Sequence, residues 1–433
     1  MSDQLERVWA AIDEREGTMI SLLRDLVRAP SLLGAERGAQ EIIHARWRQL
    51  GLDSRMWEPS VELLSKHPAY APVGLSYEGR PNVTAVLRSP IGGGRSLVLN
   101  GHIDVVSPEP VSAWSYDPWD GTIVGRRMYG RGAADMKGGI AMMALALESL
   151  LACGVVLRGD VIVETVIEEE CSGNGTLACR LAGYNADGAI ACEPHDLKAG
   201  IAAMGVMWFK VTVRGSGAHV LKAHSAVNAI EKCFPLVAAL RRLESQMNSA
   251  ITHPLYRDLE HPISLNVGKM HGGDWPSNVP SLCELECRIS YPPGVDPYHV
   301  RQQIEACVAE AAAADPWLRE MPPTVSYYGF RADGCEVDPN TDLIRILGEC
   351  HRRVLGEEMK LDIGTACNDT RYFNNYFNTP AVPYGPRGGG YHGADEYVEL
   401  GSIMDGAKVL AQFIVSWCGD GDSVPRRDQS TRG

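Results

Sequence analysis

The chain has 433 residues, of which 45% are hydrophobic and 22% are charged, as expected for a soluble globular enzyme of two or three domains. Its formal net charge is −13 and it has no basic patch or arm, which argues against nucleic acid or an anionic membrane as the main partner. The charged N-terminus lacks the apolar region of a signal peptide, and no apolar run reaches the roughly 20 residues of a membrane span, so we expect a cytoplasmic protein.

The first part of the chain alternates helical and strand-like segments. Residues 4–28 and 37–50 carry apolar side chains at helical spacing, and the stretch 137–153, rich in Ala, Met and Leu, predicts a buried helix. Short apolar runs bounded by Gly, Pro and Asn predict strands over residues 82–87, 96–99, 160–166 and 188–191. Strands that alternate with helices indicate an α/β domain with a largely parallel sheet.

The pattern changes near Lys198. The following segments predict a strand, a helix, two strands, a helix and a strand, over residues 206–213, 226–247, 263–267, 282–290, 297–314 and 324–328. This β-α-β-β-α-β order is that of a ferredoxin-like unit. After Pro339 the alternation of helices and strands returns, over residues 343–355, 369–377, 381–384 and 401–415.

Taken in chain order, these elements predict one domain interrupted by another. We expect an α/β domain with a mostly parallel sheet, formed by residues 1–202 and 331–420. An α+β ferredoxin-like domain, residues 203–330, is inserted into it. Residues 421–433 are polar, and we expect them to form a disordered tail.

A histidine and an aspartate follow the second expected strand. His102 comes directly after the buried run that starts at Ser96, and Asp104 stands two residues further on. A lone histidine at such a place is more often a satisfied core residue. A metal-bound imidazole, however, usually donates its other N–H to a carboxylate, so the pair offers a metal ligand and a group that orients it.

Asp135 stands in a glycine-rich segment, Gly130-Arg-Gly-Ala-Ala-Asp-Met-Lys-Gly-Gly139. Glycine allows backbone shapes that other residues resist, so the loop can hold a carboxylate between two ions. Metal pairs in hydrolases lie about 3.5–4 Å apart, a gap that a shared carboxylate suits. The alternative is an ordinary turn in which Asp135 caps the following helix.

Further carboxylates and a second histidine are additional candidate metal ligands. Glu168-Glu169-Glu170 follows an apolar strand, where three adjacent charges are costly unless cations lie near. Neighbours on an extended segment point opposite ways, so one glutamate can bind a metal while another faces the water. Glu193 ends the next strand, and His392 lies in a glycine-rich loop. Together these residues indicate a site for two divalent metals and a metal-dependent hydrolase.

The motifs resemble those of the dinuclear-zinc peptidase and deacylase family of acetylornithine deacetylase, succinyl-diaminopimelate desuccinylase, carboxypeptidase G and aminoacylase. The shared motifs are the Glu triplet, Glu193-Pro, a late His before Asp-Glu-Tyr, Gly101-His-Ile-Asp-Val-Val and Tyr129-Gly-Arg-Gly-Ala-Ala-Asp-Met-Lys-Gly-Gly. They occur in the family's order, and the match covers about residues 15–415. The fold implied is a zinc-peptidase-like catalytic domain that carries an inserted lid and dimerisation domain.

The resemblance also implies roles for the site residues. Asp135 bridges the two metals, which are zinc, or alternatively manganese or cobalt. Glu170 and His392 complete one metal site, and His102 and Glu193 complete the other. Glu169 is the general base that takes a proton from a water bridging the metals, with Asp104 as a supporting catalytic residue. A cis peptide bond is expected between Asp135 and Met136.

The inserted domain is implied to form a homodimer and to contribute to the substrate site. His219 would reach the active site of the partner subunit and stabilise the oxyanion there. Asn278 would contact the substrate, and Arg288 and Arg371 would bind a substrate carboxylate, a task that suits a guanidinium. For both arginines a structural ion pair is the equal alternative. The chain has Glu168 and Ser172 where the family usually has Asp and Gly, so the substrate stays open.

The expected reaction is the hydrolysis of an amide C–N bond in a small molecule, with an N-acylated amino acid or related amine as the first choice. A dipeptidase or carboxypeptidase is one alternative. Another is a hydrolase of a formamide or of an aromatic amine, since aromatic side chains surround the motifs. A binding protein without catalysis is the alternative from another class, and the complete set of ligands with Glu169 argues against it.

Overall fold

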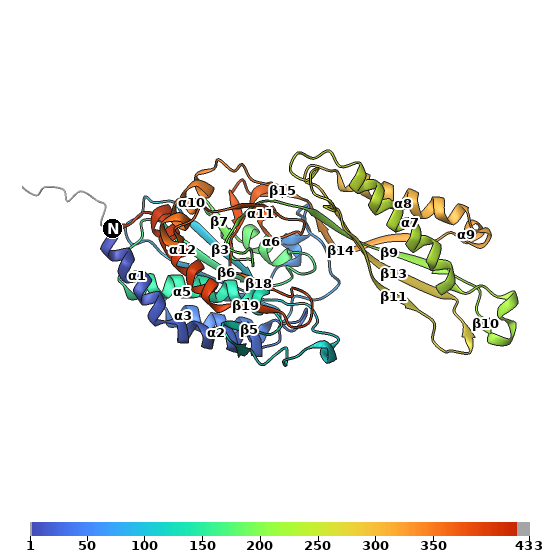
Figure 1. The fold of residues 1–433 in the computed structure, drawn as a ribbon, viewed down its shortest axis with the longest axis horizontal. Coiled ribbons are helices and arrows are strands. Elements are labelled where there is room, and N and C mark those ends of the chain that lie inside the picture. Colours follow the sequence, from blue (N-terminus) through green and yellow to red (C-terminus); the bar gives the residue numbers. More distant parts are fainter. Residues whose placement is uncertain (1, 422–433) are drawn as a thin grey trace, which may run out of the picture.

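The structure is a computed structural model and describes residues 2–421. Figure 1 shows an elongated molecule with two lobes, the first formed by both ends of the chain and the second by its middle part. Each lobe has its own main hydrophobic core. One core joins buried residues between Leu5 and Ala199 with others between Leu343 and Cys418, and the other lies between Ala202 and Leu318. The exact boundaries at 202/203 and 330/331 stay a prediction.

The first lobe is built around a six-stranded sheet with the order β1-β2-β6-β3-β7-β17. Its strands are β1 (Asp53–Trp57), β2 (Asn82–Leu87), β3 (Leu97–His102), β6 (Val161–Val166), β7 (Ala189–Ala191) and β17 (Ala381–Pro383). Strands β6, β3, β7 and β17 run parallel, whereas β2 pairs antiparallel with both β6 and β1. The mostly parallel α/β sheet is confirmed, and β1 is an edge strand that the sequence pattern does not predict.

Helices pack around this sheet (Figure 1). They are α1 (Ser2–Glu14), α2 (Glu16–Arg28), α3 (Arg37–Gln49), α4 (Val61–Leu64), α5 (Gly139–Ala152), α6 (Asn174–Leu181), α10 (Asp342–Leu355), α11 (Thr370–Tyr376) and α12 (Leu400–Cys418). The helix expected over residues 4–28 is two helices that meet at Arg15. Helix α5 contacts α1, α12 and β3, and this burial explains its composition of Ala, Met and Leu.

Two smaller sheets complete the first lobe. One has the order β18-β19-β5-β4, and the other has the order β15-β8-β16. Their strands are β4 (Thr122–Val124), β5 (Arg127–Tyr129), β8 (Ala199–Ala203), β15 (Cys335–Glu336), β16 (Leu361–Ile363), β18 (Gly388–Gly389) and β19 (Tyr397–Glu399). The first of these sheets joins the segment before α5 to the segment before α12, which lie far apart in the sequence.

The second lobe has the predicted β-α-β-β-α-β order. Its elements are β9 (Gly205–Arg214), α7 (Ala229–Ser249), β11 (Leu265–Gly272), β13 (Leu282–Tyr291), α8 (Pro297–Ala313), α9 (Pro316–Glu320) and β14 (Thr324–Ala332). The four strands form an antiparallel sheet in the order β11-β13-β9-β14. At the end of this lobe that is distant from the first, β10 (Ala218–His219) pairs with β12 (Asn278–Val279) (Figure 1).

The described part of the chain contains no helix with the length and apolar character that crossing a membrane requires. Of the expected tail, only Gly421 is described, and its N–H donates to the carbonyl of Val156 at 2.9 Å. Residues 422–433 lie outside the described residues.

Candidate metal centre

Three of the expected ligands follow parallel strands of the first lobe. His102 is the last residue of β3, Glu170 lies in the loop after β6, and Glu193 lies two residues after β7. Because the carboxyl ends of parallel strands meet at one edge of a sheet, these side chains come together there. Asp135 precedes α5, and His392 lies in the loop between β18 and β19, so the small sheet that contains β5 brings both to the same edge.

The carboxylate of Asp135 lies between two imidazole rings. Its Oδ1 is 3.1 Å from His102 Nε2, and its Oδ2 is 3.5 Å from His392 Nε2. On the first side, Glu193 Oε2 lies 3.7 Å from His102 Nε2. On the second side, Glu170 Oε2 lies 3.1 Å from His392 Nε2. The five side chains therefore form two clusters that share Asp135.

The donor atoms of these clusters suit divalent metal ions. One ligand atom from each of His102, Asp135 and Glu170 lies within 4.8 Å of the others, which is close enough for one ion to bind all three. Imidazole and carboxylate donors together suit Zn²⁺, Mn²⁺ or Co²⁺. Burial and neighbouring carboxylates raise the pKa of Glu193 to about 8 and hold the pKa of Glu169 well above its usual range. Nearby cations would relieve this accumulation of buried carboxylates.

Asp104 positions His102 through its backbone. The carbonyl oxygen of Asp104 lies 2.9 Å from His102 Nδ1, and because a carbonyl only accepts, Nδ1 carries the proton and Nε2 is left to bind a metal. The Asp104 carboxylate lies 3.8 Å from Nδ1. It accepts hydrogen bonds from the backbone N–H groups of Glu169 and Glu170, at 3.3 and 3.1 Å. The expectation that this carboxylate orients the imidazole is therefore revised, because it anchors the glutamate loop instead.

The loop that carries Asp135 is held by the buried carboxylate of Glu396. The Glu396 oxygens accept hydrogen bonds, each of 3.0 Å, from the backbone N–H groups of Gly132, Ala134 and Asp135. Gly132 has a φ of +77°, a conformation that glycine adopts at little cost. The peptide bond between Asp135 and Met136 is cis, as the resemblance implies. Helix α5 begins without a side-chain cap, so the alternative of an ordinary capped turn is wrong.

The three consecutive glutamates have different surroundings. Glu168 has a φ of 68° and is fully buried, and its carboxylate accepts hydrogen bonds from Arg80 Nη1 at 2.6 Å and from the Tyr77 hydroxyl at 3.0 Å. Glu169 is buried beside the cavity that it lines, and Glu170 belongs to the metal clusters. Glu168 is thus neutralised by the Arg80 guanidinium and does not face the water.

A cavity of about 630 Å³ opens on the metal clusters, and both lobes form its wall. The second lobe contributes Trp208 from β9, Arg288 from β13 and Phe330 from β14. No described residue accepts a hydrogen bond from the Arg288 guanidinium or forms an ion pair with it, and burial lowers its pKa. Arg288 thus lies in the cavity as a cation without a partner.

Arg371 does not line this cavity. Its side chain is buried and donates to the backbone carbonyls of Ser172 at 2.8 Å and Asn368 at 3.0 Å, and it lies 3.2 Å from the Asp369 carboxylate. These contacts direct the guanidinium into the protein. The expectation that Arg371 binds a substrate carboxylate is corrected, because the alternative of a structural ion pair describes its surroundings.

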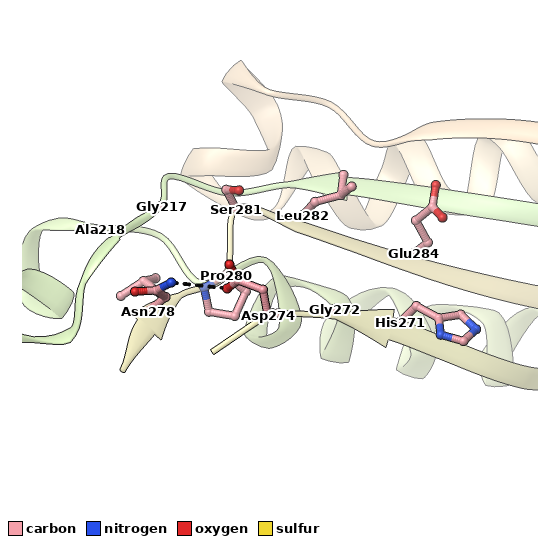
Figure 2. Close-up of a pocket in the computed structure, with 12 residues that line it drawn as sticks. Gly217, Ala218, His271, Gly272, Asp274, Asn278, Pro280, Ser281, Leu282 and Glu284 are labelled. Atoms are coloured by element: carbon pink, nitrogen blue, oxygen red, sulfur yellow. Dashed lines mark hydrogen bonds between the residues drawn. The ribbon is translucent and has the colours of Figure 1, made fainter. Parts of the chain in front are cut away.

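His219 and Asn278 lie far from the metal clusters of their own chain, at the distant end of the second lobe (Figure 1). They are cross-strand neighbours on β10 and β12, and both side chains are exposed. Asn278 Nδ2 donates to Asp274 Oδ1 at 3.4 Å and borders an open pocket of about 640 Å³, which Figure 2 shows. The chain brings the two residues together, but it does not bring them to its own metal site.

Two residues that hold the site are absent from the sequence predictions. Arg80 neutralises Glu168, and Glu396 fixes the backbone before Asp135. Arg80 lies outside any periodic segment, so no pattern marks it. Glu396 stands in the late histidine motif, and it could have been found by asking which acceptor satisfies the buried N–H groups of the glycine-rich loop.

Comparisons with known proteins identify the family of the chain. The model of the family described as peptidase family M20/M25/M40 matches residues 98–416. The N-formyl-4-amino-5-aminomethyl-2-methylpyrimidine deformylase of Halalkalibacterium halodurans is 28% identical over 436 residues, which cover 96% of this chain and 97% of that protein. The succinyl-diaminopimelate desuccinylase of Methylocella silvestris is 27% identical and covers 92% and 98% of the two chains.

Solved structures share the fold. The dipeptidase Dug1p from Saccharomyces cerevisiae superposes with a TM-score of 0.81 at 16% identity, covering 96% of this chain and 99% of its own. Human carnosine dipeptidase 1 gives a TM-score of 0.74 at 16% identity, with the same coverage of the two chains. Because the family model matches most of the chain, from residue 98 to residue 416, and the fold agrees with it, the chain belongs to peptidase family M20/M25/M40 and is a hydrolase of amide C–N bonds.

Proposed function

We propose that the protein hydrolyses the amide bond of a small N-acylated amine or amino acid at a pair of divalent metal ions. The observation that carries the proposal is the Asp135 carboxylate, whose two oxygens face two different imidazoles. His102 and Glu193 would hold one ion, and Glu170 and His392 would hold the other. Asp135 would bind both ions. Such ions, when bound, polarise a carbonyl and activate a water.

Glu169 is the general base of the proposed reaction. Its carboxylate lines the cavity beside the clusters, and burial with adjacent carboxylates raises its pKa, which favours the uptake of a proton. It would take the proton from the attacking water and give it to the nitrogen of the leaving amine. The Asp104 carboxylate supports this step because it fixes the backbone N–H of Glu169.

Arg288 is the proposed anchor for the substrate. Its guanidinium lies in the same cavity as the clusters without a partner of its own, so a carboxylate on the substrate would supply one. This supports an N-acyl amino acid, or another N-acylated amine that carries a carboxylate, as the substrate. We also propose that a homodimer forms through the second lobe, in which the exposed His219 and Asn278 of each chain reach the metal site of the partner subunit.

A second candidate is a deformylase that acts on the formamide of an aromatic amine. Two deformylases of a formylated aminopyrimidine are 28% and 27% identical to the chain over 96% of its length. The aromatic side chains of Trp208, Phe330 and Tyr391 line the cavity, which favours a flat substrate. The two candidates share the reaction and differ in the acyl group and the amine.

The substitution Glu169→Gln tests the proposal. We expect the variant to keep its metal content and to lose about 10²- to 10⁴-fold in kcat, because only the proton acceptor is removed. Metal analysis by mass spectrometry and turnover of N-acyl amino acids, dipeptides and formamides of aromatic amines provide the measurement. Unchanged turnover would contradict the role of Glu169, and hydrolysis of dipeptides alone would replace the deacylase by a dipeptidase.

A further inference from the structure

Three neighbouring strands of the second lobe, β13, β9 and β14, contribute to the wall of the cavity that the metal clusters also line. Trp208 on β9 and Arg288 on β13 are direct cross-strand partners. Residues opposite each other in an antiparallel pair project from the same face of the sheet, and both of these side chains line the cavity. An indole and a guanidinium are thus cross-strand neighbours in the wall of the cavity that the metal clusters line.

Phe330 reaches the same wall through an irregularity in β14. The pairing of β14 with β9 shifts register between Tyr327 and Arg331, and Phe330 lies within this shift. Gly329 has a φ of +56°, and a Cβ at this position would lie 2.7 Å from Trp208 Cε3. A glycine is therefore required for the β14 backbone to approach the indole this closely.

The two aromatic rings support each other. Their centroids are 5.7 Å apart with an angle of 63° between the planes, an edge-to-face contact. The Arg371 guanidinium, fixed inside the first lobe, lies 5.5 Å from the centre of the Phe330 ring. Trp208 stays half-buried, and no described residue accepts a hydrogen bond from its indole N–H. The rings form a supported apolar surface that retains an unused donor.

The combination of these side chains indicates what they bind. An aliphatic substrate with a carboxylate would use Arg288 alone and would leave the rings against water. A flat ring can lie on Trp208 and the edge of Phe330 at once, and base-like rings gain affinity from such stacking. An acceptor on the edge of that ring would meet the Arg288 guanidinium, which has no other partner.

We infer that Trp208, Phe330 and Arg288 select N-acylated amines whose amine part carries an aromatic ring with a hydrogen-bond acceptor at its edge. This inference rests on the proposed function, because the ring is located relative to an amide at the metal clusters. The acceptor is either a ring nitrogen or a carboxylate on the ring. Trp208 and Phe330 determine specificity, and the bond that is cleaved does not depend on them.

Four substrates, each prepared as the formamide and the acetamide, test the inference with the metal-loaded enzyme. The amine parts are an aminomethylpyrimidine, 4-aminomethylbenzoate, benzylamine and glycine. They present a ring with a ring nitrogen, a ring with a carboxylate, a ring alone and a carboxylate alone. We expect kcat/KM to be highest for one of the first two, and the comparison of these two identifies the acceptor.

The variants Trp208→Leu and Trp208→Phe separate a binding role from a structural one. We expect Trp208→Leu to raise KM about tenfold for the preferred substrate with kcat little changed, and to leave the glycine amide unaffected, whereas Trp208→Phe keeps the preference. Calorimetry should show the free amine of the preferred substrate binding about tenfold more weakly to the Leu variant. Tyr328→Leu is the matched control. The Tyr328 ring packs against Trp208, with 5.9 Å between the ring centroids, but it does not line the cavity.

The results that overturn the inference differ from those that overturn the proposed function. Equal losses for ring and glycine substrates in Trp208→Leu, or a wild-type preference for the glycine amide, would contradict the ring selection and leave amide hydrolysis standing. Turnover of none of the eight amides by wild-type enzyme would contradict the proposed function itself. An Arg288→Met variant that still discriminates between benzylamine and the first two amines would remove Arg288 from the selection.

Discussion

The metal centre and the tip of the second lobe, here residues 217–225 and 272–281, are organised in opposite ways. At the metal centre, buried carboxylates hold the backbone of two of the proposed ligands: Asp104 accepts from Glu170 N–H, and Glu396 accepts from Asp135 N–H. At the tip, Leu221 is 80% and Trp275 is 67% exposed. The backbone of the first region is held from within its own chain, whereas the second region exposes large apolar side chains, which fits the proposed contact with a partner subunit.

The difference also separates two kinds of residue to which we assign a function. Asp135 and its neighbours have their geometry fixed before a ligand arrives, so their substitution should change both structure and chemistry. His219 at the tip accepts a single hydrogen bond, from the N–H of Leu221 at 3.2 Å, and its substitution should change chemistry alone. Three predictions test this contrast, starting with the largest expected effect.

The largest effect is expected for Asp135→Ala. If Asp135 is shared by both ions, the variant loses both of them and its activity falls to background, as removal of the metals by a chelator would cause. Metal content and turnover are measured on the same preparation. Asp53→Asn, an exposed carboxylate of β1, is the matched control and should keep both. Retention of one ion per chain would show that Asp135 does not bridge.

A second prediction concerns the buried ion pairs behind the metal centre. Arg80 is 4% exposed and binds Glu36 and Glu168, which are both fully buried. Arg80→Met would leave two buried carboxylates without a cation, and we expect a loss of about 3–5 kcal/mol in the free energy of unfolding. Lys222→Met at the exposed tip should change it by about 0.5 kcal/mol or less. Denaturant unfolding measures both, and equal effects would remove the contrast between the two regions.

The residues of the candidate metal centre are easier to find in the sequence than the residues that support them. Each proposed ligand stands next to a glycine turn or at the end of an apolar strand. These sequence patterns are local, and they predict the backbone geometry that directs the side chain. The β-α-β-β-α-β order of the second lobe is equally readable, since its strands alternate and its helices have capping residues such as Asn228 and Asp296. These elements are confirmed.

The features that the sequence does not predict depend on contacts between distant segments of the chain. Strands β18 and β12 have two residues each, too few for any periodicity, although they place His392 and Asn278. The resemblance implies a substrate role for Arg371, with a structural ion pair as the equal alternative. Its burial follows from the backbone carbonyls of Ser172 and Asn368 that surround it, and these contacts are not visible in the sequence. The position of the Asp104 carboxylate is likewise set by the glutamate loop, 65 residues further along the chain.

The third prediction, with the smallest expected effect on the folded protein, concerns His219. We expect His219→Ala to lower kcat by about 10²- to 10³-fold, the usual cost of removing one group that stabilises an oxyanion, with metal content and the free energy of unfolding unchanged. This outcome would show that His219 contributes to catalysis and not to the stability of the protein. A parallel loss of metal would place His219 at the centre instead.

Mixing two inactive variants shows whether His219 acts across a dimer. In a mixed dimer of Glu169→Gln and His219→Ala chains, the site with an intact Glu169 can receive His219 only from the other chain. We therefore expect one of the two sites to recover, measured as turnover that appears on mixing and grows as subunits exchange. If His219 acted within its own chain, every site in the mixture would lack either the base or the histidine, and verified mixed dimers would stay inactive. Recovery would make the tip part of the partner's active site, and the exposure of Leu221 and Trp275 would then reflect the surface that closes over it.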